Sequence, residues 1–573
     1  MAYVLSITAH RTAPHPRPFS RLREKGVMEQ LILTIGYFMN HKLLFISLLL
    51  IVPSFALAAD AVSAVPAVPA TSEAEAVLRF TINHYVVDGA SLLSQAELDA
   101  AVAPYVGKNK DFSDVERALE AVEDAYAKRG YSAVRVLLPE QELEKGTVHF
   151  RVVESRFGKV TVKDNHFVSE ANALNALPSV RSGGVPRTRQ IARELKLANE
   201  NPARQMNVVL KAGDKDDVVD ANVIVTDSKP ATWGASLDNS GTPETGRARL
   251  GFSYSNANAF DADHVAGVQY MTSPSHPNRV NVLGGSYKIP LYVYSSSLEF
   301  FGGYSNVNSV VGGLSNFQGG GSLLSTRYNY TMERIGAFDR RVSLGLDWRD
   351  FRRIEMTNPQ STIYNEIVVL PVSLTYAAQG KFTKSDVGFN VSLSANLPGM
   401  SKGGVSDFAA YDTNPNHVNL EPDAHYRVLR YGANYSRLMG EGWQFRTLLN
   451  GQQSSNVLVQ GEQMRLGGAD AVRGFTEGSE GGETAARLNL EEYTPDFGRG
   501  NVRARALVFF DAGEARSSTV GKVSISSAGV GLRAGYTERY FLRADVARII
   551  KAGTDPLQQA GDWRAHISLN ATF

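Results

Sequence analysis

The C-terminal residues 563–573 read WRAHISLNATF. Apolar side chains occupy every second position from Trp563 to Phe573, and polar side chains fill the positions between them. Strict alternation over this length predicts a β-strand with one apolar and one polar face. The polar face includes Arg564 and His566, which indicates a wet, charged environment on that side of the strand.

The same alternation recurs through the C-terminal half, for example in Arg247–Tyr254 and Arg341–Arg349. About sixteen such runs fit between Ala231 and Phe573, at roughly 21 residues each with connections, which suits tilted spanning strands of roughly 10 residues. Arg and Asp share the polar face of single strands, so that face indicates a wide, wet lumen. A soluble β-sandwich also alternates, but the strand number and the charged face favour a closed barrel, since a bilayer cannot satisfy open sheet edges. We predict a membrane all-β fold with an antiparallel transmembrane β-barrel of about 16 strands over residues 230–573.

Residues 1–58 carry the signals of export rather than of a fold. A short positive region precedes the apolar run Leu43–Val52, and Ala56–Ala58 has the small residues of a cleavage site. The run is too short to span a bilayer as a helix. This order predicts a secretory signal peptide that is cleaved before Ala59, with translation starting at Met39 or Met28.

An Ala/Val/Pro-rich linker over residues 59–75 leads to two small units, 76–154 and 155–229. Both show the order β-α-α-β-β, so one unit stands twice in tandem. In the first, we expect a strand at Leu78–Ile82, helices opened by capping boxes at Ser94–Glu97 and Ser113–Glu116, a stop at Gly130, and strands at Ala133–Leu138 and Thr147–Val153. In the second, we expect a strand at Phe157–Val162, helices at Ser169–Leu177 and Thr188–Asn199, and strands at Gln205–Leu210 and Val218–Thr226. Neither unit groups catalytic residue types, so both are interpreted as adaptors whose sheet edge can accept an extended peptide.

Composition excludes several classes of function. The net charge is +1 with no basic block, so nucleic acid is not an expected partner. The absence of cysteine removes disulfides and thiolate sites, and no nucleotide-binding glycine loop is present. His264, His425 and His566 are scattered over the barrel segments without the spacing of a metal site or catalytic triad. We therefore expect no enzyme activity, no cofactor and no metal.

One loop between two strand runs stands out in the C-terminal third. Leu466–Phe475 reads LGGADAVRGF, and Arg473 is its one strong cationic hydrogen-bonding group. From spacing alone, a surface loop with an incidental arginine is an equally good interpretation.

Taken together, the signal peptide, the tandem units and the barrel resemble the two-partner secretion transporters (TpsB), which include haemolysin activators and filamentous haemagglutinin transporters. The units are similar to polypeptide-transport-associated (POTRA) domains. The POTRA-like signature comprises Tyr126, Arg129, Gly130 and Tyr131, followed by Pro139 and Gln141. The barrel motifs comprise Asp238–Gly241 and Thr245–Arg247 at its start, Val472, Arg473, Gly474 and Phe475 in the sixth extracellular loop, and Phe509–Gly513, with Asp511 and Gly513, on the thirteenth strand.

This resemblance implies that loop 463–483 folds back into the barrel and that Arg473 pairs there with Asp511. It also implies that the terminal Phe573 marks the strand that the barrel-assembly machinery recognises. Two departures are visible. Gly481–Glu483 replaces the family's Gly-Asp-X-Gly element, and the segment before the first unit is too short for a plug helix with a full linker, so we expect the inward loop to be the main closure of the pore.

The implied function is export through the bacterial outer membrane, with the POTRA domains in the periplasm and the barrel among outer-membrane lipids. The partner would be an unfolded exoprotein of haemolysin or adhesin type with an N-terminal two-partner secretion domain. One alternative is an assembly factor that inserts other outer-membrane proteins, since it shares the Arg–Asp pair; two POTRA domains rather than five favour secretion. A passive porin, the remote alternative, needs no periplasmic domains.

Overall fold

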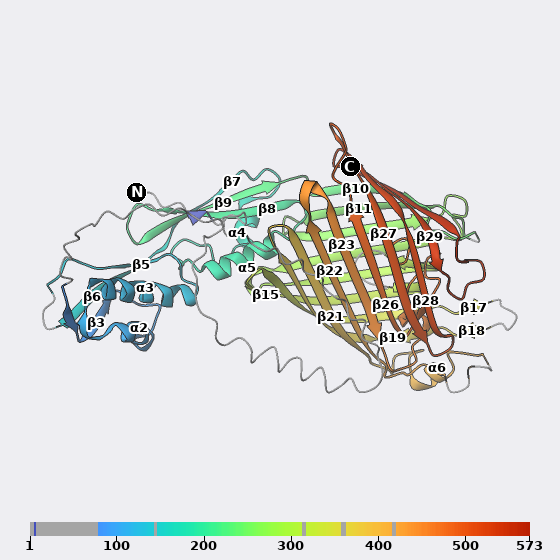
Figure 1. Cartoon of the computed structure of the whole chain (residues 1–573), viewed down its shortest axis with the longest axis horizontal. Coiled ribbons are helices and arrows are strands. Elements are labelled where there is room, and N and C mark those ends of the chain that lie inside the picture. Colours follow the sequence, from blue (N-terminus) through green and yellow to red (C-terminus); the bar gives the residue numbers. More distant parts are fainter. Residues whose placement is uncertain are drawn as a thin grey trace, which may run out of the picture.

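The computed structural model describes residues 5–6, 78–142, 146–243, 245–311, 317–356, 362–414, 417 and 420–573. The expected signal peptide, start codons and linker lie outside the described residues. Of the residues before Leu78, the structure describes only Leu5–Ser6. Two small α/β units precede a large barrel (Figure 1). Among the described residues, no helix is long and apolar enough to cross a membrane.

Sixteen antiparallel strands close the barrel within the described part of the chain, each hydrogen-bonded to its neighbours in sequence order. β19 and β20 are two pieces of one strand, since both pair with β16. The strands are β10 Ala231–Asp238, β11 Arg249–Ala259, β12 His264–Thr272, β13 Asn281–Leu291, β14 Ser296–Val311, β15 Phe317–Ile335, β16 Phe338–Phe351, β19 Ile367–Val369 with β20 Pro371–Lys381, β21 Ser385–Asn396, β22 Arg427–Leu438, β23 Gln444–Gln453, β26 Thr484–Tyr493, β27 Val502–Ser517, β28 Gly521–Tyr536, β29 Tyr540–Lys551 and β30 Trp563–Thr572. The predicted barrel is confirmed.

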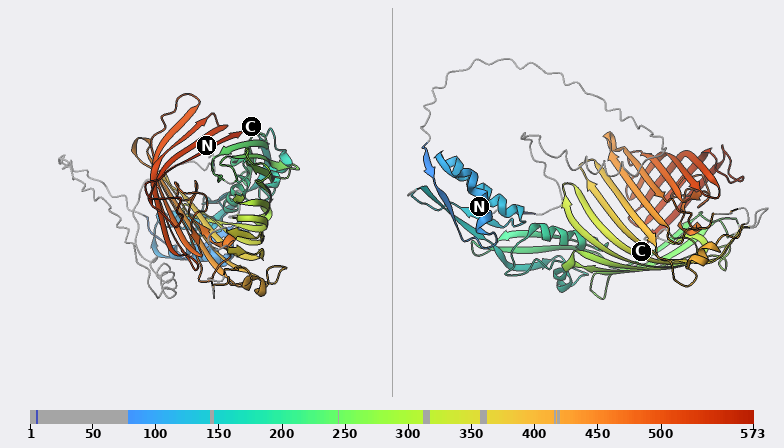
Figure 2. Two further views of the ribbon diagram at one scale, coloured as in Figure 1. Left: turned by 90° about the vertical axis from the view of Figure 1, so that its right-hand side faces the viewer. Right: turned by 90° about the horizontal axis from the view of Figure 1, so that it is seen from below.

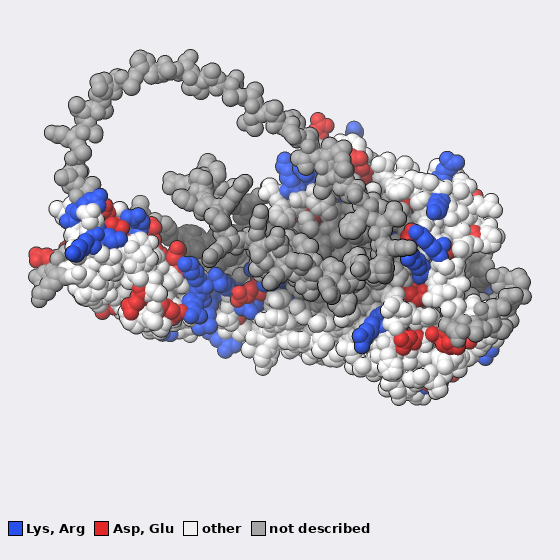
Figure 3. Space-filling model, turned by 60° about the horizontal axis from the view of Figure 1, so that its bottom comes forward, with Lys and Arg blue, Asp and Glu red and all other residues white. Residues whose placement is uncertain are grey.

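Alternation along each strand separates an apolar outer face from a polar lumen. On β16, Leu344 and Leu346 are 53% and 45% exposed on the outside, whereas Asp347 and Arg349 are buried on the inside. Figure 3 shows the consequence on one face of the molecule, where much of the visible barrel wall lacks charged residues. Such a belt matches the lipid-facing band of a transmembrane barrel.

The barrel closes between its first and last strands. β10 pairs with β30 from Gly234 opposite Thr572 to Asp238 opposite Ser568. Beyond one end of this ladder, the N–H of Phe573 donates to the carbonyl of Trp233 at 2.8 Å. The terminal residue thus adds backbone pairing to the closing seam while its ring remains exposed on the outside.

The first N-terminal unit differs from the expectation in its first strand. Its three-stranded sheet has the order β3–β6–β5, whereas β2 pairs with β4 in a separate ribbon. The expected strand at Leu78–Ile82 is therefore wrong as the sheet strand, because the sheet takes His84–Asp88, where Tyr85 is buried against Phe150. This strand is short of apolar residues at its ends, where Asn83, His84 and Asp88 stand, so the sequence pattern did not indicate it. The elements are β2 Phe80–Ile82, β3 His84–Asp88, α2 Gln95–Val102, η1 Ala103–Tyr105, β4 Gly107–Lys110, α3 Phe112–Lys128, β5 Val134–Leu137 and β6 Thr147–Glu154.

The two capping boxes of this unit have different outcomes. The box at Ser94 is confirmed, since the N–H of Ser94 donates to Glu97 at 3.0 Å. The box at Ser113 is wrong, because α3 begins two residues earlier. Asp111 accepts the N–H of Ser113 at 3.0 Å, and Asp114 accepts the N–H of Asp111 at 3.1 Å. A carboxylate at the cap satisfies the free N–H groups of the first turn, which places Ser113 inside the helix.

The second unit has the expected order of elements. Its strands pair as β8–β9–β7, and Leu5–Ser6 (β1) pairs with the outer edge of β8. The elements are β7 Arg156–Lys163, α4 Glu170–Asn175, α5 Thr188–Ala198, β8 Arg204–Ala212 and β9 Val218–Asp227. The unit lies directly at one end of the barrel, called here the near end (Figure 2).

A buried ion pair joins the second unit to the near end. Arg204 of β8 lies 2.6 Å from Asp263 in the turn between β11 and β12, and both side chains are almost fully buried. Tyr292 donates to the same carboxylate at 2.7 Å. Partnered charges in a dry contact give the joint a defined geometry.

Candidate transport site: the inward loop and the lumen

The connection between β23 and β26 folds into the lumen and closes on itself. Near its base, β24 Met464–Arg465 pairs with β25 Gly481–Gly482. Further in, the N–H of Val472 donates to the carbonyl of Leu466 at 2.8 Å. The loop is therefore a compact structure, and it presents residues 472–475 to the barrel wall.

Arg473 forms a two-pronged ion pair with Asp511 of β27. Its Nε and Nη2 atoms lie 2.6 and 2.8 Å from the two carboxylate oxygens. The backbone N–H of Arg473 adds a third bond at 3.1 Å. The two residues are only 1% and 0% exposed. A planar guanidinium held by two parallel bonds fixes the direction as well as the distance of the loop.

Further groups of the wall surround the guanidinium. Its Nη1 atom lies 2.8 Å from Glu491 of β26 and 3.7 Å from Asp545 of β29. Its carbon lies 3.5 Å from the centroid of the Phe509 ring, a cation–π contact. Strands β26, β27 and β29 together form a cation-binding recess in the lumen wall, and Arg473 fills it.

Asn489 of β26 completes this recess. Its amide donates to Asp511 at 2.8 Å and to the carbonyl of Ala471 in the loop at 2.6 Å. One side chain thereby binds both the loop and the carboxylate that receives it.

Gly474 needs to be glycine for two reasons. Its φ is +93°, and an added Cβ would lie 3.2 Å from the Cβ of Ala547. Its N–H donates to Nε2 of His566 on β30 at 3.0 Å. The loop therefore approaches the wall at backbone distance.

Apolar contacts support the charged ones. Val472 and Phe475 are buried in a cluster with Leu466, Ala485, Ala515, Val523, Ile525 and Ile549. Gly513 lies beneath this cluster, since an added Cβ would be 3.2 Å from Leu466 and Val472. The motif glycine on β27 thus leaves room for the loop.

The far end of the lumen has a second closure that sequence reasoning missed. Residues of the connection between β21 and β22, including Phe408 of α6 Val405–Ala409 and Tyr411, pack on lumen-facing Phe301, Leu323 and Phe351. The lumen is therefore partly filled with apolar side chains here, and the expectation that the inward loop is its main closure is incomplete.

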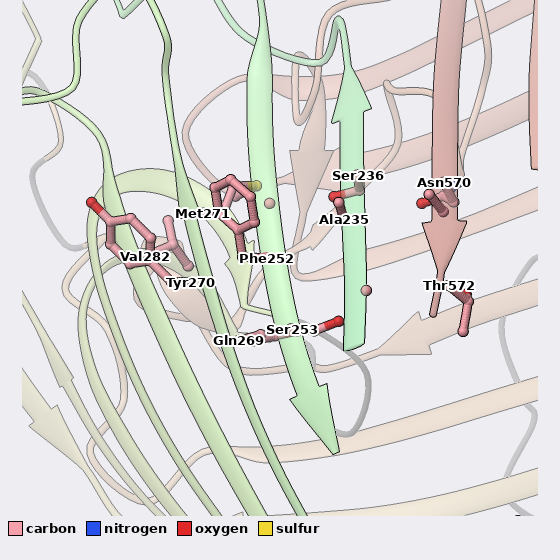
Figure 4. Close-up of a pocket in the computed structure, with 13 residues that line it drawn as sticks. Ala235, Ser236, Phe252, Ser253, Gln269, Tyr270, Met271, Val282, Asn570 and Thr572 are labelled. Atoms are coloured by element: carbon pink, nitrogen blue, oxygen red, sulfur yellow. The ribbon is translucent and has the colours of Figure 1, made fainter. Parts of the chain in front are cut away.

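Another part of the lumen wall remains open. Strands β30, β10, β11 and β12 border a hollow of about 300 Å³ (Figure 4). Its polar lining is small and uncharged, with Ser236, Ser253, Gln269, Asn570 and Thr572. On β30, Asn570 is exposed, whereas His566 is 4% exposed beneath the loop. The inward loop therefore covers the lumen side of β30 at His566 but not at Asn570.

Within the POTRA-like signature, Tyr126 and Arg129 hold the first unit together. The Tyr126 hydroxyl donates to Glu154 at 2.8 Å, and burial raises the pKa of Tyr126 well above its usual range. Arg129 pairs with Glu97 through its Nε at 2.8 Å. Bonds from the Ser94 side chain and backbone, together with Arg129, lower the pKa of Glu97 to about 2.

Other signature residues connect elements. The carbonyl of Gly130 accepts the N–H of Thr188 at 3.1 Å. The Tyr131 hydroxyl accepts a bond from Arg187 at 3.0 Å, which joins the two units.

Gln141 forms two amide bonds with the backbone of His149, at 2.7 and 2.8 Å. Through them it continues the pairing of β6 beyond the end of β5. Pro139 lines a neighbouring hollow of about 290 Å³.

Sequence reasoning did not identify Glu491, Asp545 or His566 as contacts of the loop. Glu491 and Asp545 lie on the lumen-facing sides of β26 and β29, but alternation along a strand does not say which polar residues meet the loop. Arg204 and Asp263 were also missed, because neither lies in a motif. Among the described residues, no group of three His, Asp or Glu side chains could hold a metal ion.

Comparisons with known proteins agree with this architecture. Residues 80–155 match the family described as POTRA domain, ShlB-type. Residues 219–534, more than half of the chain, match the family described as Haemolysin secretion/activation protein ShlB/FhaC/HecB.

Individual relatives cover most of the chain. The Heme/hemopexin transporter protein HuxB of Haemophilus influenzae is 24% identical, covering 79% of this chain and 80% of its own length. The Outer membrane transporter CdiB of Escherichia coli is 26% identical over 74% of this chain and 71% of its own. The solved structure of CdiB from Escherichia coli superposes with a TM-score of 0.71 at 20% identity, covering 88% and 93% of the two chains. The chain belongs to the haemolysin secretion/activation family, the non-enzymatic two-partner secretion transporters of the outer membrane, which export exoproteins.

Proposed function

We propose that this chain exports one exoprotein, which its two POTRA domains, residues 76–154 and 155–229, recognise by an N-terminal secretion domain. The partner arrives unfolded in the periplasm, threads through the barrel formed by residues 230–573, and folds outside. The observation that carries this proposal is the Arg473–Asp511 pair, which holds the inward loop inside the lumen. Opening this lock removes one of the two obstructions from the path, the other being the apolar closure at the far end.

Two features of the POTRA domains support recognition of an extended chain. The outer edge of β8 pairs with Leu5–Ser6, so this edge can receive an added strand through main-chain bonds. The first domain has a hollow of about 290 Å³ lined by Phe80, Phe112 and Val115, beside Pro139. Phe112 is 57% exposed there, and the hollow suits an apolar side chain of the arriving partner.

The open hollow between β30 and β12 supports a route for the threading chain. It faces the lumen with small, uncharged side chains such as Ser236, Ser253 and Asn570. An uncharged wall of this kind holds few strong partners for a passing polypeptide, which favours movement over retention.

Energy for export comes from the partner. The sequence has no phosphate-binding loop, and the outer membrane has no ATP supply. Folding of the emerging chain outside removes it from the lumen and makes the passage directional.

A large haemolysin- or adhesin-type exoprotein is proposed as the partner. The description of the matching family as haemolysin secretion/activation protein supports this class, and one relative bears the name heme/hemopexin transporter. Outer-membrane lipids cover the apolar wall, and the barrel-assembly machinery inserts the protein by recognising its last strand with Phe573.

Secretion assays test the proposal. The chain is expressed together with a candidate exoprotein that carries an N-terminal secretion domain, with and without that domain. We expect partner in the medium only when both the chain and that domain are present. Unchanged secretion without the domain would refute the recognition step. A general loss of other outer-membrane proteins after deletion of the chain would instead support an assembly factor.

A further inference from the structure

Glu462 lies at the base of the inward loop, away from the Arg473 motif. It belongs to the short helix η5 Gln460–Glu462, and its side chain is fully buried. The carboxylate lies 2.7 Å from Arg349 of β16 and 3.1 Å from Arg430 of β22. A fully buried anion between two arginines is a built ion-pair site.

The same cluster holds both ends of the loop. Arg430 donates to Gln452 of β23 at 2.9 Å. The amide of Gln452 donates to the carbonyls of Glu462 and Glu483, at 2.9 and 3.3 Å. Residues on either side of the inward segment are thereby fixed to one position on β23.

The cluster also reaches across the barrel. β16 and β22 are not neighbours, because the β19/β20 strand and β21 lie between them. Arg349 is further held by Asp347 at 2.5 Å on its own strand. Glu462 therefore links two separated sections of the wall, while Arg473 binds a third section formed by β26, β27 and β29.

The loop contributes opposite charges to the two sites. At the tip, the Arg473 cation meets wall carboxylates; at the base, the Glu462 anion lies between two wall arginines, one of which also pairs with Asp347. Exchange of the two loop charges would place like charges together at both sites, which favours one docked orientation.

We propose that Glu462 is a positioning residue that anchors the base of the inward loop and thereby aims Arg473 at Asp511. The proposal deepens the proposed gating function, since it rests on the loop being the gate. When the tip opens, the base remains bound and guides the loop back after export.

The test measures the position of the tip without any partner protein. Two cysteines are introduced, at Thr476 in the tip and at Gln558 in the connection between β29 and β30. These residues are in contact, since the N–H of Thr476 donates to the side-chain oxygen of Gln558 at 2.7 Å. Because the chain has no cysteine of its own, they are the only two thiols in the protein. The yield of cross-linking by a short bifunctional thiol reagent reports docking. In Glu462→Gln we expect the yield to fall several-fold, with a matched rise in closed-state conductance in planar bilayers. The control is Lys522→Gln, which breaks an exposed pair with Glu514 and leaves both readings unchanged.

A second variant separates anchoring from folding. Arg349→Gln and Glu462→Gln are made singly and together, and we expect the effect of the double variant to be smaller than the sum of the two single effects, since the two residues share one contact. Normal cross-linking in a folded Glu462→Gln barrel would overturn the proposal, as would additive effects in the double variant. Failure of both variants to form a heat-modifiable barrel would also overturn it, because the cluster would then be a folding core. Reduced cross-linking with unchanged export of the partner would support the anchoring role and count against the gating function instead.

Discussion

The carboxylate of Asp511 receives Nε and Nη2 of Arg473 on its two oxygens, 38 residues away along the chain. The pair is buried between the loop and β27, and Asn489 bonds to both the carboxylate and the loop backbone. Docking of the loop therefore depends on the two bonds between the guanidinium and the carboxylate, and substitution of either residue removes them.

Replacing Arg473 by alanine or lysine tests that dependence. Loss of the guanidinium leaves Asp511 buried and unpaired, at a cost of about 3–5 kcal/mol to the docked loop. Lysine keeps the charge but cannot form the two-pronged contact. We expect both variants to insert at normal abundance and to secrete less partner, measured by quantifying partner in the medium. Normal export by Arg473→Ala would contradict the role of the pair.

Gly513→Val tests the apolar side of docking. The new side chain would enter space used by Leu466 and Val472, which lie 3.2 Å from an added Cβ. We expect an undocked loop and a leaky pore, measured as antibiotic sensitivity and bilayer conductance. Gly285→Val is the matched control, because the nearest atom to its added Cβ lies 3.8 Å away. Equal leakage in both variants would mean that any strand substitution suffices.

Arg204→Met tests the joint between the second POTRA domain and the barrel. It leaves Asp263 buried without its cation, which costs about 3–5 kcal/mol. We expect faster hydrogen exchange in β8 and in the turn between β11 and β12, with an unchanged barrel. Lys196→Gln breaks a partly exposed pair with Asp339 and is expected to change the joint by at most about 1 kcal/mol. Equal protection in Arg204→Met and the wild type would contradict this account.

Acid should loosen the first POTRA domain. The pKa of Glu97 is lowered from 4.5 to about 2. Burial alone would raise the pKa of Glu154, but bonds from Ser91, Leu92 and Tyr126 outweigh it and lower this pKa. Both carboxylates therefore stabilise the fold above pH 4.5. Glu97 loses that contribution as the pH falls toward about 2, and Glu154 loses it as the pH falls through its own lowered pKa.

Hydrogen exchange of α3, corrected for intrinsic rates, measures this effect between pH 7 and pH 3. We expect protection to fall with pH in the wild type and to depend less on pH in Glu154→Gln. An identical pH profile in the two proteins would show that Glu154 does not contribute.

Removal of Phe573 tests the closing seam. The deletion removes the two backbone bonds that Phe573 exchanges with Trp233, at 2.8 and 3.1 Å, together with the exposed terminal ring. We expect less heat-modifiable barrel in the outer membrane, and Phe573→Tyr should retain most of it because an aromatic ring and the backbone remain. Equal loss in both variants would show that the barrel needs the unmodified phenyl ring of Phe573, and that the backbone pairing at the seam is not what the deletion affects.

Particular elements show how far sequence reasoning reached. The alternation of Leu344 and Leu346 with Asp347 correctly predicted which side chains face lipid, because strand geometry sends neighbours to opposite faces. The first sheet strand was wrong, because Tyr85 is buried by Phe150, a distant partner. Asp511 was matched to Arg473 by resemblance alone, and Glu462 offered no comparable signal.

The sequence by itself determined the order of domains, the strand pattern and the polarity of each barrel face, since these follow from local periodicity. Tertiary structure alone decided which lumen residues meet the loop. Closing the barrel brings β26, β27 and β29 together around Arg473, and it places β16 and β22 around Glu462. Such ion pairs depend on strand register and on a folded loop, and neither is encoded in the spacing of the residues that form them.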